Sequence, residues 1–170
     1  MKNSAPDAIE FLKEDHETVK KLFKQFKTAS NAEDDEKKAG IVEEITEALE
    51  AHAAVEEEIF YPAVKKARSE NTKDIVREAY EEHTQIKALL AALSEIEPND
   101  ETYDAKMKVL QEDVEHHVEE EEGEMFPDAR KFIRKDGLQS LGEQMAERKA
   151  ELMPNQSAEE ESPKRGARGK

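Results

Sequence analysis

His52-Ala53-Ala54-Val55-Glu56 stands before Tyr61-Pro62, and the same arrangement recurs as His117-Val118-Glu119-Glu120-Glu121 before Phe126-Pro127. In both copies the proline follows the histidine by ten positions. Residues four apart lie on one face of an α-helix, so each copy directs an imidazole and a carboxylate the same way. Two such pairs that face each other would form a metal site.

An acid four residues after a histidine is by itself a weak signal in this chain. Asp and Glu make up 42 of the 170 residues, whereas there are only 6 prolines. A proline at the same offset in both copies is therefore the rarer coincidence. It indicates that the two segments are an internal duplication.

Composition favours a single helical domain. Charged residues make up 40% of the chain and hydrophobic residues 36%, and there is no Trp. Good helix formers dominate, and 170 residues are enough to bury a full core. We predict an all-α fold whose domain covers residues 1–153, followed by a disordered polar and basic tail at 154–170.

Charge and residue usage exclude several classes of protein. The formal net charge of −16 disfavours nucleic acid as the main partner, because most of the surface would repel a phosphate backbone. The absence of cysteine excludes disulfides, zinc-thiolate sites and iron–sulfur clusters. No run of 18 apolar residues and no signal pattern is found, so we expect a cytoplasmic protein without a membrane segment.

Apolar periodicity and helix-end signals predict four long helices. Their expected ranges are from Ser4–Asp7 to Ser30–Asn31, from Glu33–Glu36 to a kink or break near Phe60–Tyr61 before Pro62, from an Asn71–Thr72 cap to Pro98, and from Asp100 to Pro127. Gly137 is expected to separate a short C-terminal helix at Leu138–Met153. Short connections between four long helices predict an up-down-up-down bundle.

Each predicted long helix carries one histidine on its apolar stripe. These residues are His16, His52, His83 and His117. A single core histidine is more often structural, hydrogen-bonded to a carbonyl or carboxylate, but four on four helices favour a shared site. The fifth, His116, lies about 100° around the helix from His117 and is expected at the surface.

The donor set predicts a binuclear metal centre. Four imidazoles with Glu56 and Glu121 are too many ligands for one ion, and the two glutamates are placed to bridge two ions. Imidazole and carboxylate without thiolate suit iron or manganese well and zinc acceptably. Glu57, Glu82 and Glu122 adjoin these residues. Acids of this kind usually face solvent, and the alternative is that they support or supplement the metal ligands.

The combined motifs resemble the hemerythrin-like HHE cation-binding family between about Ala8 and Lys135. The resemblance rests on Asp15-His16, His52 to Glu57, Glu82-His83 and His117 to Glu122, in that order and spacing. It implies a hemerythrin-like four-helix bundle with two iron ions (Fe2+/Fe3+), oxo- or hydroxo-bridged. The matching metal ligands would be His16, His52, Glu56, His83, His117 and Glu121.

Two departures separate the chain from oxygen-carrying members of that family. Those members have H-x-x-x-H on the third helix, whereas Ala79 and Lys87 flank His83 at that spacing. They also have H-x-x-x-x-D on the fourth helix, where Glu121 follows His117 one residue sooner. The missing imidazole disfavours reversible oxygen carriage. We expect a protein that binds or senses O2 or NO or handles iron, with peroxidase, catalase-like or ferroxidase activity in stress protection as the alternative.

Overall fold

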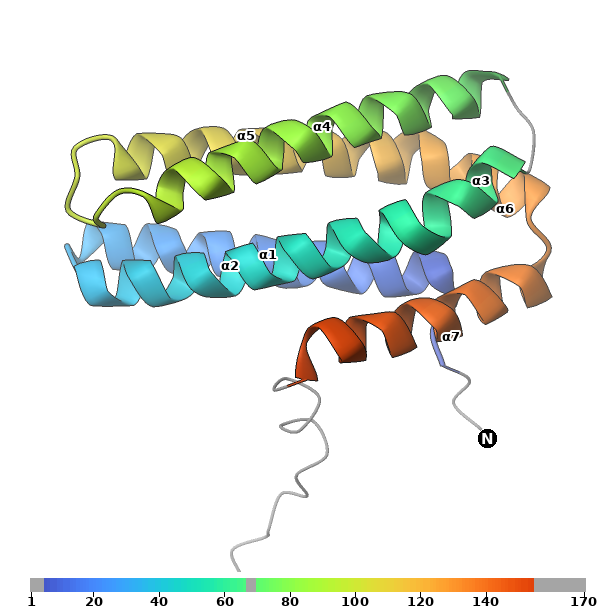
Figure 1. Cartoon of the computed structure of the whole chain (residues 1–170), viewed down its shortest axis with the longest axis horizontal. Coiled ribbons are helices and arrows are strands. Elements are labelled where there is room, and N and C mark those ends of the chain that lie inside the picture. The colour runs from blue at the N-terminus through green and yellow to red at the C-terminus, as the bar shows by residue number, and fades with distance from the viewer. Residues whose placement is uncertain (1–4, 67–69, 155–170) are drawn as a thin grey trace, which may run out of the picture.

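The computed structural model describes residues 5–66 and 70–154, and every element within those ranges is helical. Four long helices form two antiparallel pairs that stack as two layers (Figure 1). Their bounds are α1 Ala8–Asn31, α2 Asp35–Val55, α4 Glu70–Ser94 and α5 Tyr103–Glu120. The up-down-up-down bundle predicted from the sequence is therefore confirmed.

Helix α1 begins with a capping box. The Asp7 side chain accepts hydrogen bonds from the backbone N–H groups of Ile9 and Glu10, and the Glu10 carboxylate accepts from the Asp7 N–H at 3.1 Å. These bonds satisfy N–H groups that have no partner inside the helix. The cap is thus Asp7, and Pro6 stands before the helix rather than in its first turn.

Pro62 and Pro127 lie within continuous helical segments and not at the ends of helices. A π-helical turn precedes each one: η1 (Glu56–Phe60) leads into α3 (Tyr61–Lys66), and η2 (Glu121–Met125) leads into α6 (Phe126–Phe132). The Tyr61 N–H donates to the Glu56 carbonyl, and the Phe126 N–H donates to the Glu121 carbonyl. A wider turn tolerates a residue that cannot donate to the carbonyl four positions back. At the predicted kink or break near Phe60–Tyr61, the structure thus has a change of helix type.

Two other predicted boundaries differ from the structure, and a third is not tested by it. Helix α4 already contains Asn71 and Thr72, so the cap predicted there is wrong. Gly137 does not precede the C-terminal helix but lies in the first turn of α7 (Lys135–Leu152). The chain changes direction before it, at Ile133, whose backbone is extended. The predicted disordered tail falls almost entirely on residues 155–170, which lie outside the described part of the chain.

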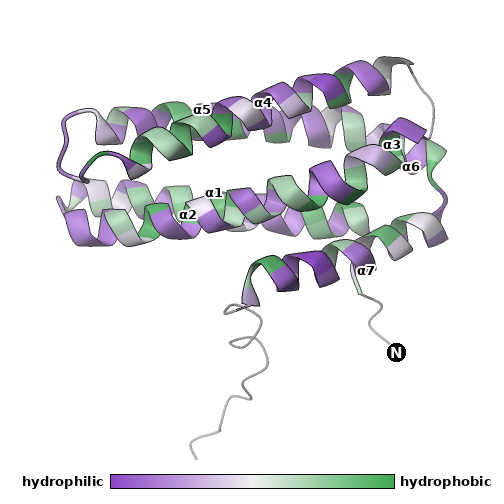
Figure 2. Cartoon of the chain, viewed as in Figure 1, coloured by the Kyte–Doolittle hydropathy of each residue, from purple (hydrophilic) through white to green (hydrophobic). Residues whose placement is uncertain are grey.

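The buried core has two parts, one on each side of the histidines along the bundle axis. One part fills the end where α1 meets α2 and α4 meets α5, and it includes Phe26, Ile45 and Leu110. The other fills the end beside α3, α6 and α7, and it includes Phe60 and Phe126. Polar and apolar residues alternate around every helix, as Figure 2 shows. The histidines therefore sit in a water-poor layer between two apolar clusters.

Helix α7 packs outside the four-helix bundle, against α1, α2 and η1 (Figure 1). Leu138 and Met145 bury the inward face of this helix. Its approach to the start of α1 is so close that a Cβ on Gly142 would lie 2.5 Å from the Pro6 carbonyl oxygen. Only glycine fits there, which fixes the position of α7 along α1.

Candidate metal centre

The structure brings all six predicted ligand residues to one place in the middle of the bundle. Each of the four long rods contributes a histidine, and the two π-helical turns each begin with one of the glutamates. All six residues are at most 6% exposed; they are His16, His52, Glu56, His83, His117 and Glu121. The His116 side chain, by contrast, is 62% exposed, as predicted from its place on the helix.

Both carboxylates at the centre of the bundle belong to residues that begin a π-helical turn. In both repeats the glutamate is the first residue of the π turn and follows its histidine by one α-helical turn. The Nε2 atom of His52 lies 3.3 Å from Glu56 Oε2, and that of His117 lies 3.6 Å from Glu121 Oε2. Each H-x-x-x-E motif thus directs both of its polar side chains inward, as the sequence predicted.

The donor atoms form two groups that share one carboxylate. The first group contains His16, His52, Glu56 and Glu121, and the second contains Glu56, His83 and His117. Within each group the donors lie within 4.8 Å of one another. Glu56 Oε2 lies 3.3 Å from His83 Nε2, which makes Glu56 the residue that links the groups. The division into two histidines per group is the one expected for a pair of ions.

Every inward-facing imidazole is held from behind by a carboxylate at its Nδ1 atom. The pairs are His16 with Glu122 at 2.9 Å, His52 with Asp15 at 3.4 Å, His83 with Glu57 at 2.8 Å and His117 with Glu82 at 2.6 Å. An ionised carboxylate only accepts hydrogen bonds, so Nδ1 carries the proton in each ring. In the neutral ring, the lone pair of Nε2 is then free to bind a cation.

With this tautomer, the centre contains buried nitrogen and oxygen atoms whose lone pairs could bind a cation. His83 Nε2 and His117 Nε2 are 3.1 Å apart, and with protons on both Nδ1 atoms this contact would set two lone pairs against each other. Four buried atoms have no hydrogen-bond partner among the described residues: His16 Nε2, His52 Nε2, Glu56 Oε1 and Glu121 Oε2. His16 Nε2 and Glu121 Oε2 are 3.2 Å apart, close enough for an ion pair but without hydrogen-bond geometry. Buried unpaired polar atoms are destabilising, and bound cations would satisfy all of these.

Electrostatics point in the same direction. Burial lowers the pKa of His52 to about 4 despite the opposing effect of Asp15, so this imidazole is neutral at pH 7. Burial, together with the charge of Glu121, raises the pKa of Glu56 well above its usual range. Burial acts to raise the pKa of Glu121 as well, but His117 and His16 outweigh it and the pKa falls. Two carboxylates in one dry site oppose each other's ionisation, and positive charge between them would relieve this.

Tyr61 is a further site residue, and the sequence pattern identifies it only as the aromatic position before a proline. Its hydroxyl donates to Glu121 Oε1 at 2.8 Å and lies 3.3 Å from both Glu56 Oε2 and His83 Nε2. The side chain is fully buried, and burial followed by the charge of Glu56 raises the pKa of its phenol well above the usual value. Tyr61 therefore keeps a proton at the centre.

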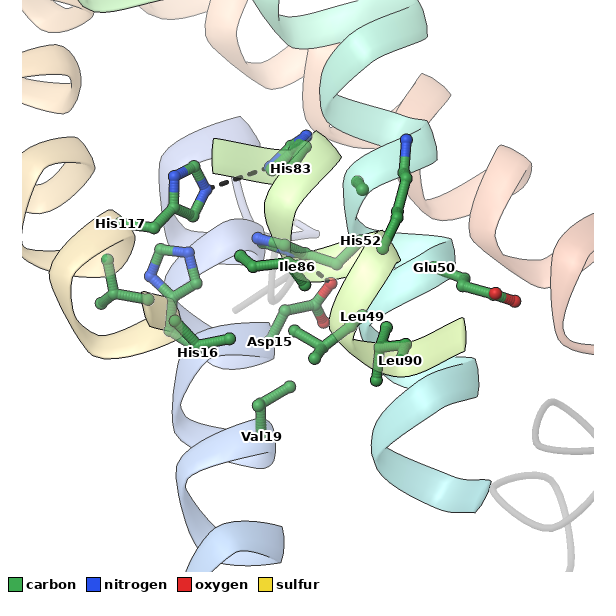
Figure 3. Close-up of a pocket in the computed structure, with 14 residues that line it drawn as sticks. Asp15, His16, Val19, Leu49, Glu50, His52, His83, Ile86, Leu90 and His117 are labelled. Atoms are coloured by element: carbon green, nitrogen blue, oxygen red, sulfur yellow. Dashed lines mark hydrogen bonds and ion pairs between the residues drawn. The ribbon is translucent and has the colours of Figure 1, made fainter. Parts of the chain in front are cut away.

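A small cavity adjoins the histidines on the side of the Phe26 core (Figure 3). All four inward-facing histidines border it, and its apolar wall comes from Val19, Leu49, Ile86, Leu90 and Val114. Its volume is about 20 Å³, enough for a water or a diatomic molecule and too little for an organic substrate. Glu50 and Lys87 lie at its polar edge.

The supporting carboxylates were only partly foreseen from the sequence. Glu57, Glu82 and Glu122 were considered because each adjoins a proposed ligand, and all three contact a histidine of another helix. Asp15 was noted only as part of the Asp15-His16 motif, yet it reaches His52 on α2. The sequence signal is common to the set: each acid is next in sequence to one site residue and supports another across the bundle.

Comparison with known proteins agrees with this geometry. Residues 7–129 match the hemerythrin HHE cation-binding domain. The crystal structure of a hemerythrin HHE cation-binding domain-containing protein from Mycobacterium kansasii is similar, with a TM-score of 0.76 and 25% identity over 94% of this chain and 95% of that one. A DNA nickase from Nostoc sp. is 30% identical over 112 residues, which cover 66% of this chain and 30% of that protein.

The chain belongs to the hemerythrin HHE cation-binding family, because the matched domain covers most of its length. The expected family and the hemerythrin-like bundle are therefore confirmed, and the two His/Glu groups are consistent with a metal-binding role. Among the helices of the described residues, none is both long and apolar enough to cross a bilayer.

Proposed function

We propose that this protein binds two iron ions and presents them to a small ligand such as O2 or NO. The ligands would be His16, His52, Glu56 and Glu121 for one ion, and His83 and His117 with Glu56 for the other. The observation that carries this proposal is the set of buried Nε2 and carboxylate oxygen atoms that face one another without partners among the described residues. Bound iron would supply the positive charge that they lack and a site for redox chemistry.

The choice of a small diatomic ligand rests on the cavity beside the histidines. It is about 20 Å³ in volume and mainly apolar, so it admits small neutral molecules and excludes larger or charged ones. Sensing or iron handling is favoured over reversible carriage, because the third helix has Ala79 and Lys87 where oxygen carriers have a second histidine. The proposed centre therefore has one imidazole ligand fewer than that of an oxygen carrier.

Iron loading and spectroscopy test the proposal. The purified protein should hold close to two iron ions per chain and show the absorption of an oxo-bridged pair, which should change when O2 or NO is added. Replacing Ile86 with Phe should fill the cavity, leave the iron content unchanged and abolish the response to gas. An iron content far below two per chain, with no such absorption, would exclude the proposal.

A second candidate function is oxidation chemistry with peroxide, and Tyr61 is the observation that favours it. Its hydroxyl holds a proton 2.8 Å from Glu121 and 3.3 Å from Glu56, in position to exchange it with a small molecule in the centre. Steady-state peroxide consumption by the iron-loaded protein, compared with an equal amount of free iron, tests this candidate. Equal rates would exclude it.

The activity named for the Nostoc protein is not extended to this chain. The shared region spans only 30% of that protein, so the likeness concerns one part of it. The net charge of −16 also opposes close approach to a DNA backbone. Iron and a small ligand account for the buried centre without nucleic acid.

A further inference from the structure

The carboxylates behind the four histidines are themselves in contact with outer basic side chains. Lys13 lies 3.6 Å from Glu122, Lys87 lies 2.7 Å from Glu57, and His116 lies 3.6 Å from Glu82. The fourth contact joins Lys149 to Asp15. Each imidazole is thus the inner end of a chain of contacts that runs outward through a carboxylate.

The contact between Lys149 and Asp15 differs from the other three in its burial. The Asp15 side chain is 9% exposed and that of Lys149 is 26% exposed, whereas Lys13 and Lys87 are 49% and 46% exposed. Water and salt screen a buried pair much less than an exposed one. Lys149 is also fixed by the ring of Phe11, whose centroid lies 5.4 Å from its ammonium group.

The imidazole at the inner end of this chain is the one held least tightly. His52 Nδ1 lies 3.4 Å from Asp15, whereas the other three histidines lie 2.6 to 2.9 Å from their carboxylates. Asp15 divides its two oxygens, with Oδ2 toward His52 and Oδ1 toward Lys149, as Glu122 and Glu82 also divide theirs. The longer contact to His52 and the more buried lysine make the orientation of His52 depend on its outer partner more than that of the other histidines.

We propose that Lys149 is a positioning residue of the metal centre, which acts through Asp15 to hold His52 with Nε2 free and directed inward. This rests on the proposed role of His52 as a metal ligand. Helix α7 is then a functional part of the site, although it lies beyond the matched domain at residues 7–129. Without the ammonium group, the buried Asp15 carboxylate loses the partner that fixes its orientation and turns away from His52. The Nδ1 hydrogen bond then weakens.

Metal release to a chelator tests this role in the full-length, iron-loaded protein. Lys149→Met should release one of the two ions about 10- to 100-fold faster than the wild type, the range typical when an outer partner of a ligand is lost. The second ion should leave at the wild-type rate, because His83 and His117 have their own supports. Lys149→Arg retains the charge and should restore slow release.

Two further variants separate positioning from simple docking of α7. Arg148→Met removes another contact of α7, the 2.8 Å ion pair with Glu58 on η1, and should release iron as the wild type does. Asp15→Asn should release the same ion as Lys149→Met, and the two substitutions together should add no further effect. An additive double variant, or an equal effect of Arg148→Met, would overturn the proposal.

A measurement on the metal-free protein supplies a readout that does not depend on iron. Nitrogen-15 NMR of the imidazoles should show His52 protonated at Nδ1 in the wild type and a mixture of tautomers in Lys149→Met. If the wild type holds no iron, the proposed function fails, while the NMR result still decides whether Lys149 controls His52. An unchanged His52 tautomer together with unchanged metal release would refute this role for Lys149.

Discussion

Replacing Glu56 with Gln should stabilise the metal-free protein and remove most of the stabilisation that bound metal adds. Glu56 is 0% exposed and lies 3.3 Å from the Nε2 atoms of His52 and His83. Burial and the charge of Glu121 raise the pKa of its carboxyl group well above 4.5. An amide has nearly the same shape but carries no charge, so the substitution separates the effect of charge from that of packing.

In the metal-free protein the substitution should be stabilising at neutral pH. Because the folded pKa lies above the unfolded value of 4.5, Glu56 leaves the fold undisturbed below that pH and destabilises it as the pH rises toward the folded pKa. Glutamine removes this dependence. We expect a gain in the free energy of unfolding of about 2 kcal/mol at pH 7, the size of one uncompensated buried polar group, and no gain near pH 4.

Added metal should stabilise the variant much less than it stabilises the wild type. Glu56 is the one residue common to both groups of donor atoms, so both ions lose a carboxylate ligand. Metal present at 100 times its Kd stabilises the wild type by about 2.7 kcal/mol. A roughly 100-fold loss of affinity in the variant would remove most of that stabilisation.

Urea denaturation with a chelator and with excess metal measures both effects. Glu124→Gln is the matched control, since Glu124 is an exposed carboxylate in the corresponding π-helical turn and should leave both curves unchanged. A variant that is less stable than the wild type without metal, or equally stabilised by metal, would refute the assigned position of Glu56 at the centre of the site.

His117→Ala should lose most bound metal by elemental analysis, whereas His116→Ala at the neighbouring exposed position should keep it; equal losses would contradict the choice of inward-facing histidine. Gly142→Ala should lower the free energy of unfolding by about 1–3 kcal/mol, because its Cβ would lie 2.5 Å from a backbone oxygen just before α1. Gly40→Ala, where a Cβ meets nothing within 4 Å, should instead raise it by about 0.5–1 kcal/mol, and thermal unfolding measures both. Tyr61→Phe should keep the metal but lower the free energy of unfolding by about 1–2 kcal/mol and slow any peroxide consumption, so an unchanged rate would remove the hydroxyl from the chemistry.

The helices and the inward direction of the histidines were predictable because both depend on local periodicity. An apolar residue every three or four positions specifies a helix and its buried face, and a histidine on that stripe must be buried with it. His16, His52, His83 and His117 follow this rule and are all buried. The ends of the helices were less predictable: at Pro62 and Pro127 a wider turn keeps the rod continuous where a kink or break was the simpler expectation.

The supports of the site could not be derived in the same way. Asp15 and His52 are 37 positions apart, and Lys149 and Asp15 are 134 apart, so neither contact follows from a helical repeat. Tyr61 is visible in the sequence as part of the aromatic-proline pair, but its hydroxyl bonds to Glu121, 60 positions away on another helix, which a local pattern does not specify.

The sequence by itself determined an all-helical bundle, the family and the identity of the six inward-facing donor residues, because side-chain direction along a helix is set by local geometry. The tertiary structure decided which histidines stand together, which carboxylate joins the two groups, and which acids and cations stand behind each imidazole. These depend on how whole helices pack against one another. Packing of that kind is a property of the assembled core, which no single helix encodes.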